Sequence, residues 1–407
     1  MANNKESSDQ LKALQVDLSP EQADLVKKIT GFIQKNLEAG NHAVFTIQGE
    51  AGTGKSVVLG HLFVKLQQLA RQEGTVFSKT KNVFLVNHPE VLKVYQELAN
   101  QYSFIFKKNF QRPTTFINQA EKAKRVDDVV LIDEAHLLLS EPDHYNNYYG
   151  QNQLADILDH ARVVVLVFDS NQVIKTKAFW TRQMIAKTTA GCVREDYQLK
   201  KQFRMQAPRV LEEWIDAFAQ EQKLEPLDMR AANNKYEFRF FDDAEKMYQL
   251  LRKRDKQFGK ARIAATISYP RKKKVKRNYV VDGDFCLPWD KYNYSPVPWA
   301  EIPSTVNEVA SIHTLQGFDL NYIGILIGPG VKLDPENPNR LLVDPAKMTY
   351  KSMYYKRADL TGPDLDLATK RLFLNALSVL MKRGRRGLYL FVHDKQLRER
   401  IEDLLED

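Results

Sequence analysis

The fold of this chain is decided by one stretch of its sequence, Gly49-Glu50-Ala51-Gly52-Thr53-Gly54-Lys55-Ser56. The stretch has the pattern G-x-x-x-x-G-K-[ST] of a phosphate loop, and it follows an apolar run at residues 43–47 that predicts a buried strand. Glycines let successive backbone N–H groups turn toward one anion, and the following helix adds the positive end of its dipole. We therefore expect all eight residues to bind a nucleoside triphosphate, with Lys55 on its β- and γ-phosphates and the Ser56 hydroxyl on Mg²⁺.

Length and composition set the broad class of the protein. The 407 residues suit two domains of about 200 residues each. No apolar stretch reaches the roughly 18 residues that a membrane span needs, and the N-terminus is polar, which predicts a soluble, cytoplasmic protein. Cys192 and Cys286, the two cysteines, lie far apart, which argues against a disulfide framework and against a cysteine zinc site. The eight histidines show no spacing typical of metal ligands, so nucleotide-bound Mg²⁺ is the one metal that we expect.

The net charge of +9 is compatible with a polyanionic partner. An excess of lysine and arginine is also common on ordinary solvated surfaces, so charge alone favours nucleic acid only modestly. The densest basic run, residues 270–277, is interpreted either as a contact to nucleic-acid phosphates or as the solvated tip of an insertion.

Short apolar runs alternate with amphipathic helical stretches along both halves of the chain. This alternation predicts an α/β fold with parallel sheets flanked by helices. A polar segment at residues 220–234 predicts a linker, and we place the domains at 1–225 and 226–407. Residues 268–304 and 329–368 are predicted to be surface insertions. The predicted strands are residues 43–47, 83–86, 129–132 and 163–168, then 236–241, 262–266, 309–313, 322–327 and 388–392.

The predicted strand at residues 129–132 runs directly into Asp133 and Glu134. In a protein that also has a phosphate loop, Asp133 could hold the metal through water, and Glu134 could orient and deprotonate an attacking water. The same pair would also be unremarkable in a solvated turn. The phosphate loop upstream favours the catalytic interpretation.

Three further side chains suit a nucleotide site in a protein that acts on a polymer. Gln22, in the first turn of a predicted helix, could pair with the adenine edge, and Gln172 could touch the γ-phosphate from the carboxyl edge of the sheet. Arg204, in Gln202-Phe203-Arg204-Met205, is expected near the domain junction. Each of the three, taken alone, is equally compatible with a capped turn or a surface charge.

In this order the motifs resemble those of superfamily 1 helicases. Residues 312–319, Ile-His-Thr-Leu-Gln-Gly-Phe-Asp, are similar to motif V, and residues 375–387 are similar to motif VI. More closely, the segments HTLQGFD and VLMKRGRRGLYLFV resemble a bacterial and phage family of uncharacterised helicase-like ATPases related to the Schlafen helicase domain. The resemblance spans about residues 15–395 and implies two RecA-like domains with ATP bound between them.

The resemblance also implies a role for individual residues. Gln22 would read adenine, Lys55 and Ser56 would bind phosphate and Mg²⁺, Asp133 and Glu134 would be the hydrolytic pair, and Gly317 would belong to the nucleotide site. The γ-phosphate sensors would be Gln172, Arg204 and Arg383. Lys382 stands where the family has threonine, which leaves Arg383 and Arg385 as alternatives for the motif VI arginine, and Asp319 stands where glutamate is commoner.

The same resemblance implies that single-stranded nucleic acid crosses both domains. Its implied contacts are Asn87, His88, Thr114, Thr115, Phe116, His313 and Thr314. These residue types can bond phosphates or stack on bases. Two alternatives stand beside this interpretation, since Asn87-His88-Pro89 also fits a helix cap and Phe116 also fits a buried core position. For His136, too, both a functional and a purely structural role are compatible with the sequence.

Together, these observations predict an ATP-dependent translocase or helicase acting on DNA or RNA. The alternative is an ATP-driven switch that senses nucleic acid or a protein partner without unwinding, as part of a defence or mobile-element complex. A third possibility, a scaffold that has lost hydrolysis, is disfavoured because Lys55, Asp133, Glu134 and Gln172 are all present.

Overall fold

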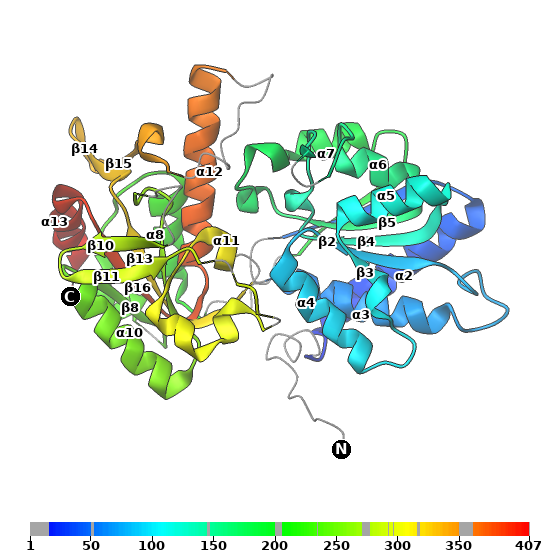
Figure 1. The fold of residues 1–407 in the computed structure, drawn as a ribbon, viewed down its shortest axis with the longest axis horizontal. Helices are drawn as coiled ribbons and strands as arrows, with labels where there is room; N and C mark the ends of the chain where they lie inside the picture. The colour runs from blue at the N-terminus through cyan, green and yellow to red at the C-terminus, as the bar shows by residue number, and fades with distance from the viewer. Residues whose placement is uncertain are drawn as a thin grey trace. The chain divides into compact units, whose positions relative to one another are not determined.

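A computed structural model describes residues 16–49, 53–144, 147–199, 206–233, 235–270, 277–291, 293–295, 297–315, 318–349 and 361–406. The chain divides into two compact units (Figure 1). Unit 1 comprises Met1–Val173 and Lys177–Gln202, and unit 2 comprises Ile174–Thr176 and Phe203–Asp407.

The division lies at residues 202/203 and not at residue 225, where we had placed it. Helix α8 (Arg209–Gln220) packs on α12 (Pro363–Met381), and Gln220 Nε2 of α8 donates to Ser378 Oγ at 3.3 Å. The expected linker belongs to unit 2 as well, because strand β7 (Leu227–Asp228) pairs with β17 (Leu405–Glu406) near the C-terminus. Contacts distant in sequence therefore determine the boundary.

The sheet of unit 1 has six strands in the order β3-β2-β4-β5-β1-β6, and all of its pairs are parallel. The carboxyl ends of the strands consequently lie at one edge of the sheet, where ligands of such sheets bind. The strands are β1 (Ala43–Gln48), β2 (Asn82–Val86), β3 (Phe110–Gln111), β4 (Asp127–Asp133), β5 (Ala161–Phe168) and β6 (Val193–Gln198).

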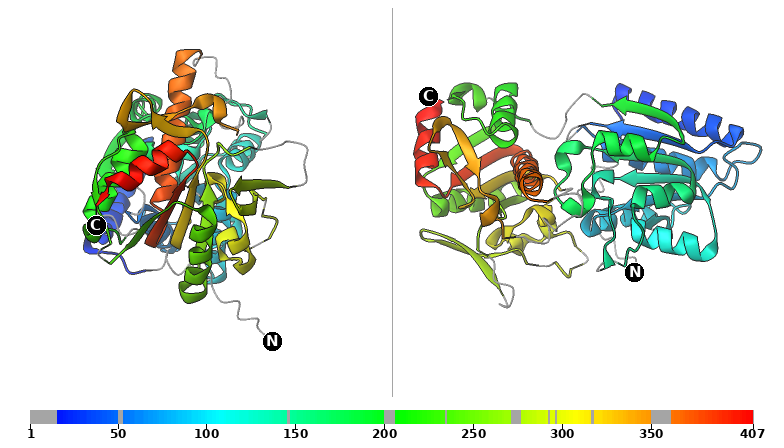
Figure 2. Two further views of the ribbon diagram at one scale, coloured as in Figure 1. Left: turned by 90° about the vertical axis from the view of Figure 1, so that its left-hand side faces the viewer. Right: turned by 90° about the horizontal axis from the view of Figure 1, so that it is seen from above.

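Helices cover both faces of this sheet (Figures 1 and 2). On one face lie α2 (Pro20–Ala39), α3 (Lys55–Leu69) and α4 (Pro89–Glu97); the rings of Phe32 and Phe45 meet there at 5.3 Å, and those of Phe63 and Phe84 at 5.5 Å. On the other lie α5 (Pro113–Ala123), α6 (Gln153–Asp159) and α7 (Arg182–Thr188), which pack on the alternate strand residues Val44, Val130 and Val164.

The sheet of unit 2 has the order β10-β11-β12-β9-β13-β16-β8, in which the β10–β11 pair is antiparallel and the others are parallel. Helix α10 (Ala244–Phe258) packs on β9, β13 and β16, and α13 (Lys395–Leu404) follows β16. The strands are β8 (Glu237–Phe241), β9 (Ala261–Ala265), β10 (Asn278–Asp282), β11 (Phe285–Trp289), β12 (Val309–Ala310), β13 (Leu320–Ile327) and β16 (Gly384–Val392).

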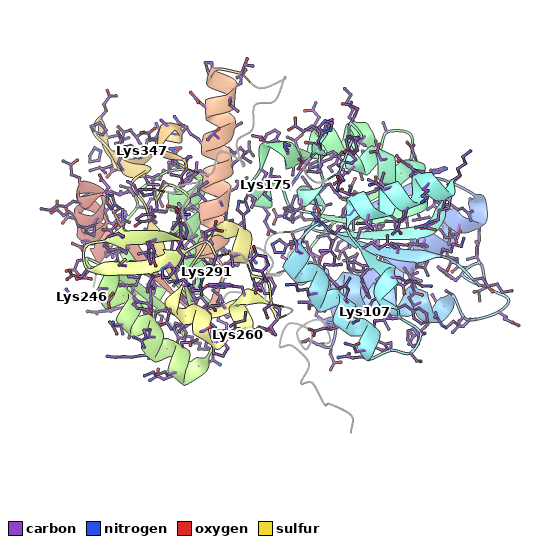
Figure 3. The ribbon with its side chains drawn as sticks, viewed as in Figure 1. Lys107, Lys175, Lys246, Lys260, Lys291 and Lys347 are labelled. Atoms are coloured by element: carbon purple, nitrogen blue, oxygen red, sulfur yellow. The ribbon has the colours of Figure 1, made fainter. Side chains whose placement is uncertain are left out.

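Both predicted insertions of unit 2 contain antiparallel hairpins. Residues 268–304 contain β10–β11, and residues 329–368 contain β14 (Val331–Asp334) and β15 (Asn337–Val343), followed by the first turn of α12. Two lysines labelled in Figure 3 anchor the first insertion, since Lys260 pairs with Glu301 at 3.5 Å and Lys291 pairs with Glu308 at 2.6 Å.

The α/β class with parallel sheets flanked by helices is confirmed, and all nine predicted strands correspond to strands of the structure. The run at residues 309–313 is shorter than predicted, because β12 ends at Ala310 and helix α11 (Ile312–Leu315) follows it. Within the described ranges, no helix has the length and apolar character needed to cross a lipid bilayer.

Candidate active site

The phosphate loop leads from β1 into α3. Gly54 precedes the helix with φ of +77°, and a Cβ atom at this position would lie 2.2 Å from Gln22 Nε2. The left-handed conformation therefore favours glycine, and an added Cβ atom would also have to displace the end of the Gln22 side chain. Among the described residues no side chain caps α3, and the positive end of the helix dipole at this terminus would attract an anion.

Lys55 lies at the centre of a buried polar cluster. Its Nζ donates to the carbonyl of Gly49 at 2.7 Å and lies 3.8 Å from Oδ2 of Asp169. The same Asp169 oxygen accepts a hydrogen bond from Gln172 Nε2 at 2.8 Å, where the short helix η5 (Ser170–Gln172) follows β5. The adjacent strands β1 and β5 thus bring Lys55 and Gln172 to one carboxylate. Asp169 was not predicted as a site residue, although it lies only three residues before Gln172 in the sequence.

Asp133 is the last residue of β4 and is buried. Its Oδ2 accepts from the Tyr95 hydroxyl at 2.6 Å, and its Oδ1 accepts from the Glu134 backbone N–H at 3.0 Å. Burial and then the charge of Glu134 raise the pKa of Asp133 to about 6, against hydrogen bonds from Tyr95 and Ser56 that favour the ionised form. The predicted pair Ser56 and Asp133 is therefore brought together, and Tyr95 is a neighbour that was not predicted as a site residue.

Glu134 turns the chain sharply at the end of β4. Its φ of +55° is unusual for a residue with a side chain, and it leads into the short helix η3 (Ala135–Leu137). Glu134 Oε2 lies 2.9 Å from Nε2 of His136, which is completely buried. The turn places two carboxylates side by side at the carboxyl edge of the sheet, next to the phosphate loop. His136 contacts the expected catalytic base and does not lie on the surface.

Gln22 has an observed structural role beside its predicted one. Its backbone N–H donates to Ser19 Oγ at 3.3 Å, and its Oε1 accepts from the Ser19 N–H at 3.0 Å, which completes a capping box at the start of α2. The cap holds the amide nitrogen against Gly54, at the end of the phosphate loop. Recognition of adenine by Gln22 stays a prediction.

Four of the residues expected to contact nucleic acid follow the carboxyl ends of β2 and β3. Asn87 Nδ2 donates to the Leu137 carbonyl at 2.6 Å, and His88 Nδ1 accepts from the Val91 N–H at 3.4 Å as the cap of α4. Thr114 Oγ1 accepts from Gln153 Nε2 at 3.0 Å. Thr115, in the first turn of α5, is exposed. The helix-cap interpretation of His88 is thus observed, and a role of these four residues in binding nucleic acid stays a prediction.

The structure corrects the prediction for Phe116. Its ring is completely buried in the core beneath α5, and the guanidinium of Arg125 lies 5.9 Å from the ring centroid. Stacking on a base requires an accessible ring, so the prediction that Phe116 contacts nucleic acid is wrong. Its spacing along α5 is that of a core residue.

The expected site residues of unit 2 lie in helix α11 and at the junction between α12 and β16. His313 and Thr314 lie in α11, where Thr314 Oγ1 is 3.4 Å from Ser311 Oγ. Arg383 lies between α12 and β16, and its Nη1 donates to the carbonyl of Phe318 at 3.3 Å. Lys382 pairs with Asp216 of α8 at 2.5 Å, and Arg385 is exposed.

Several predicted positions lie outside the described residues. They are Glu50, Ala51 and Gly52 of the phosphate loop, Arg204, Gly317, and residues 271–276 of the basic run.

The side chains that are described fit a nucleotide with a divalent cation. Burial disfavours the ionised form of Asp133, and a cation bound beside Ser56 would stabilise that form. Lys55 and the uncapped N-terminus of α3 provide positive charge where phosphates would lie. A donor set of one hydroxyl and one carboxylate, completed by water and phosphate oxygens, is typical of Mg²⁺ sites in nucleotide-binding proteins.

Two solved helicase structures resemble this chain at 11% sequence identity. The helicase of PRRSV matches with a TM-score of 0.37 over 90% of this chain and 56% of that chain, a little over half of its length. The Pif1 helicase from Candida albicans matches with a TM-score of 0.36 over 96% of this chain and 100% of that chain.

A sequence relative and a family model place the chain more firmly. The Saccharomyces cerevisiae protein named "Uncharacterized protein YPL245W" is 34% identical over 419 residues, which cover 95% of this chain and 90% of the yeast protein. This yeast relative does not support the expected bacterial and phage origin of the family, whereas the expected relationship to Schlafen is confirmed. The model of the Schlafen group 3 DNA/RNA helicase domain matches residues 42–394, and the chain belongs to this family.

Proposed function

We propose that this chain hydrolyses ATP and uses the hydrolysis to move along or remodel single-stranded nucleic acid, in the manner of superfamily 1 helicases. The observation that carries the proposal is the convergence of Lys55, Asp133, Glu134 and Gln172 at the carboxyl ends of β1, β4 and β5. Membership of a helicase-domain family supports the second half of the proposal.

Each residue of the cluster has a chemical role in this proposal. Lys55 and the first turn of α3 would hold the phosphates, and Ser56 and Asp133 would hold Mg²⁺, which, when bound, neutralises charge on the β- and γ-phosphates. Glu134 would orient the attacking water and accept its proton. Gln172, held by Asp169, would contact the γ-phosphate from the end of β5. The resemblance to superfamily 1 assigns the remaining positive charge to Arg204 and Arg383.

The test is ATP hydrolysis by the wild type and by Glu134→Gln, each alone and with single-stranded DNA, single-stranded RNA or duplex. The wild type should be stimulated by one of these polymers. Loss of the general base should slow hydrolysis by about 10²- to 10⁴-fold while nucleotide binding persists. Glu121→Gln, on the exposed side of α5, is the matched control and should hydrolyse ATP at the wild-type rate.

A strand-displacement assay separates this proposal from the sensing switch. Stimulated hydrolysis with displacement supports a helicase, and stimulated hydrolysis without displacement supports a nucleic-acid switch. Hydrolysis that ignores every polymer would overturn the role in nucleic-acid remodelling and point to regulation by a protein partner. Nucleotide binding without any turnover would overturn the enzymatic proposal altogether.

A further inference from the structure

Tyr95 is held rigidly beneath the candidate metal site. It lies in the last turns of α4 and is completely buried. Its ring centroid is 4.3 Å from that of Phe84 on β2 and 6.1 Å from that of Phe110 on β3, and the Phe110 ring is nearly parallel to it. Phe63 of α3 packs on both phenylalanines, at 5.5 and 5.1 Å. Close packing on these rings leaves the phenol little freedom to turn.

The hydroxyl of this fixed ring meets the one carboxylate expected to bind Mg²⁺. Tyr95 donates to Asp133 Oδ2 at 2.6 Å, which is at the short end of O–H···O distances and typical of a bond to an ionised acceptor. The phenol also lies 3.4 Å from the backbone carbonyl of Ser56, in the first turn of α3. Tyr95 therefore contacts both segments that supply the proposed Mg²⁺ ligands.

The two oxygens of Asp133 are bonded in different directions. Oδ2 accepts from Tyr95, and Oδ1 accepts from the Glu134 backbone N–H at 3.0 Å. The Ser56 hydroxyl also bonds to this carboxylate, so the plane of the carboxylate cannot rotate without breaking at least one of these hydrogen bonds. A bound cation or its water would use the remaining lone pair.

We propose that Tyr95 is a positioning residue that holds the Asp133 carboxylate in the orientation that binds the divalent cation. The inference rests on the proposed function of this site. A phenol suits the task because it donates a hydrogen bond without adding a positive charge, so it orients Asp133 and leaves the carboxylate charge to the metal. Partners of this kind around ligating carboxylates typically change metal affinity by about 10- to 100-fold when they are removed.

The chain offers a matched control for the removal of this hydroxyl. Tyr148 is also buried in unit 1, and its hydroxyl donates to Asp156 Oδ2 at 2.5 Å, away from the phosphate loop and from Asp133. Tyr95→Phe and Tyr148→Phe each delete one oxygen from a tyrosine–aspartate hydrogen bond, in which both tyrosines are buried and Asp156 is half-buried. A general loss of rigidity would follow from both variants, whereas a loss of metal affinity should follow from Tyr95→Phe alone.

The experiment measures Mn²⁺, as a substitute for Mg²⁺, by electron paramagnetic resonance in the presence of the β,γ-imido analogue of ATP, with protein in excess over the analogue. Tyr95→Phe should raise the dissociation constant of Mn²⁺ about tenfold, and Tyr148→Phe should match the wild type. The Mg²⁺ concentration for half-maximal hydrolysis should shift by the same factor, with a smaller change in kcat at saturating Mg²⁺. Phe84→Leu, which loosens the packing but keeps the hydroxyl, should give a weaker shift in the same direction.

The possible failures are distinct. If the wild type shows no nucleotide-dependent binding of Mn²⁺, the proposed function itself is overturned. If the wild type binds Mn²⁺ and Tyr95→Phe binds it equally well, only the role of Tyr95 is overturned. Equal losses in Tyr95→Phe and Tyr148→Phe would also overturn it, because they would show a structural effect.

Discussion

Lys55 Nζ and Asp169 Oδ2 lie 3.8 Å apart, and both side chains are almost completely buried. The same oxygen of Asp169 accepts from Gln172 Nε2 at 2.8 Å. The Asp169 carboxylate therefore holds Lys55, the first residue of α3, beside Gln172, which follows β5. Within unit 1, a change that moves Gln172 therefore also removes a hydrogen bond from the carboxylate that pairs with Lys55.

Asp169→Asn should impair catalysis without unfolding unit 1. The substitution removes the negative charge beside a buried lysine and weakens a bond to Gln172, and a hydrogen bond to a charged group contributes about 1.5–3 kcal/mol. We expect kcat/KM for ATP to fall about 10- to 100-fold. Asp128→Asn is the control, since Asp128 pairs with Arg162 at 3.3 Å near the opposite end of β4. Equal effects of the two substitutions would contradict a specific role for Asp169.

Gly54→Ala should abolish nucleotide binding. Gly74→Ala is the control that separates the effect of the left-handed backbone from the effect of the contact with Gln22. The two glycines have almost the same φ, +77° and +76°, but a Cβ atom at Gly54 would meet Gln22 Nε2, whereas nothing lies within 4 Å at Gly74. Each alanine should cost about 1–2 kcal/mol of unfolding free energy from the left-handed backbone. Thermal unfolding and binding of a fluorescent ATP analogue measure both effects. Intact nucleotide binding by Gly54→Ala would show that the close contact with Gln22 is not required.

Arg383, and not Arg385, is expected to act as the motif VI arginine. Arg383 is connected to the segment that resembles motif V, because it donates to the carbonyl of Phe318, whereas Arg385 is exposed. The Arg383 side chain is 1% exposed, so contact with the γ-phosphate would require this hydrogen bond to open. Arg383→Ala should lower kcat by at least about 100-fold, since arginines that stabilise phosphoryl transfer commonly contribute more than this. Arg385→Ala should stay within a few-fold of the wild type. The opposite ranking, in variants with equal melting temperatures, would assign the role to Arg385.

Glu237→Gln should destabilise unit 2 in a pH-dependent way. Burial alone would raise the pKa of Glu237, but hydrogen bonds from Arg254 and Tyr389 and the charges of Arg254 and Arg239 outweigh it and leave the pKa below its ordinary value. The ionised Glu237 carboxylate and its partners therefore stabilise unit 2 fully above about pH 4.3, the pKa of glutamate in an unfolded chain. This stability is lost as the pH falls through the lower pKa of Glu237 in the folded state.

The expected loss from Glu237→Gln at pH 7 is about 2 kcal/mol. Melting temperatures between pH 3.5 and pH 7 should converge with those of the wild type at the acidic end. The exposed pair Arg209–Glu213 provides the control, because Glu213→Gln should have almost no effect at any pH. A constant difference across the pH range would contradict the assignment to this charge.

The strands that hold the site were predictable because parallel strands covered on both faces are continuously apolar, as in residues 163–168. Strand β6 was missed for the opposite reason. This strand lies at the edge of the sheet, and its first residue, Val193, is 45% exposed. Three charged residues follow Val193 within the strand, so the sequence of β6 resembles a surface loop. The hairpins of unit 2 were missed because proline, tyrosine and charge in residues 268–304 and 329–368 hide a short alternation.

Local sequence could not distinguish aromatic residues that serve the site from those that fill the core. Tyr95 and Phe116 both occur at helical spacing, and both are buried. Tyr95 meets Asp133 only because α4 packs on β2 and β3, and β2 is the strand that pairs with β4. Phe116 is excluded from the surface by the packing of α5. The motif residues Lys55, Asp133, Glu134 and Gln172 were recognisable, since each lies at the carboxyl end of a strongly apolar strand or within seven residues after it.

The left-handed backbone at Glu134 sets function against stability at one position. A residue with a side chain is strained by about 1–2 kcal/mol in this conformation, and glycine is not. A lineage that no longer needed to activate water could exchange this glutamate for glycine and become more stable in doing so. Persistence of the acid at this turn in relatives of the chain would therefore record continued selection for turnover, and its replacement by glycine would mark a descendant that keeps the fold alone.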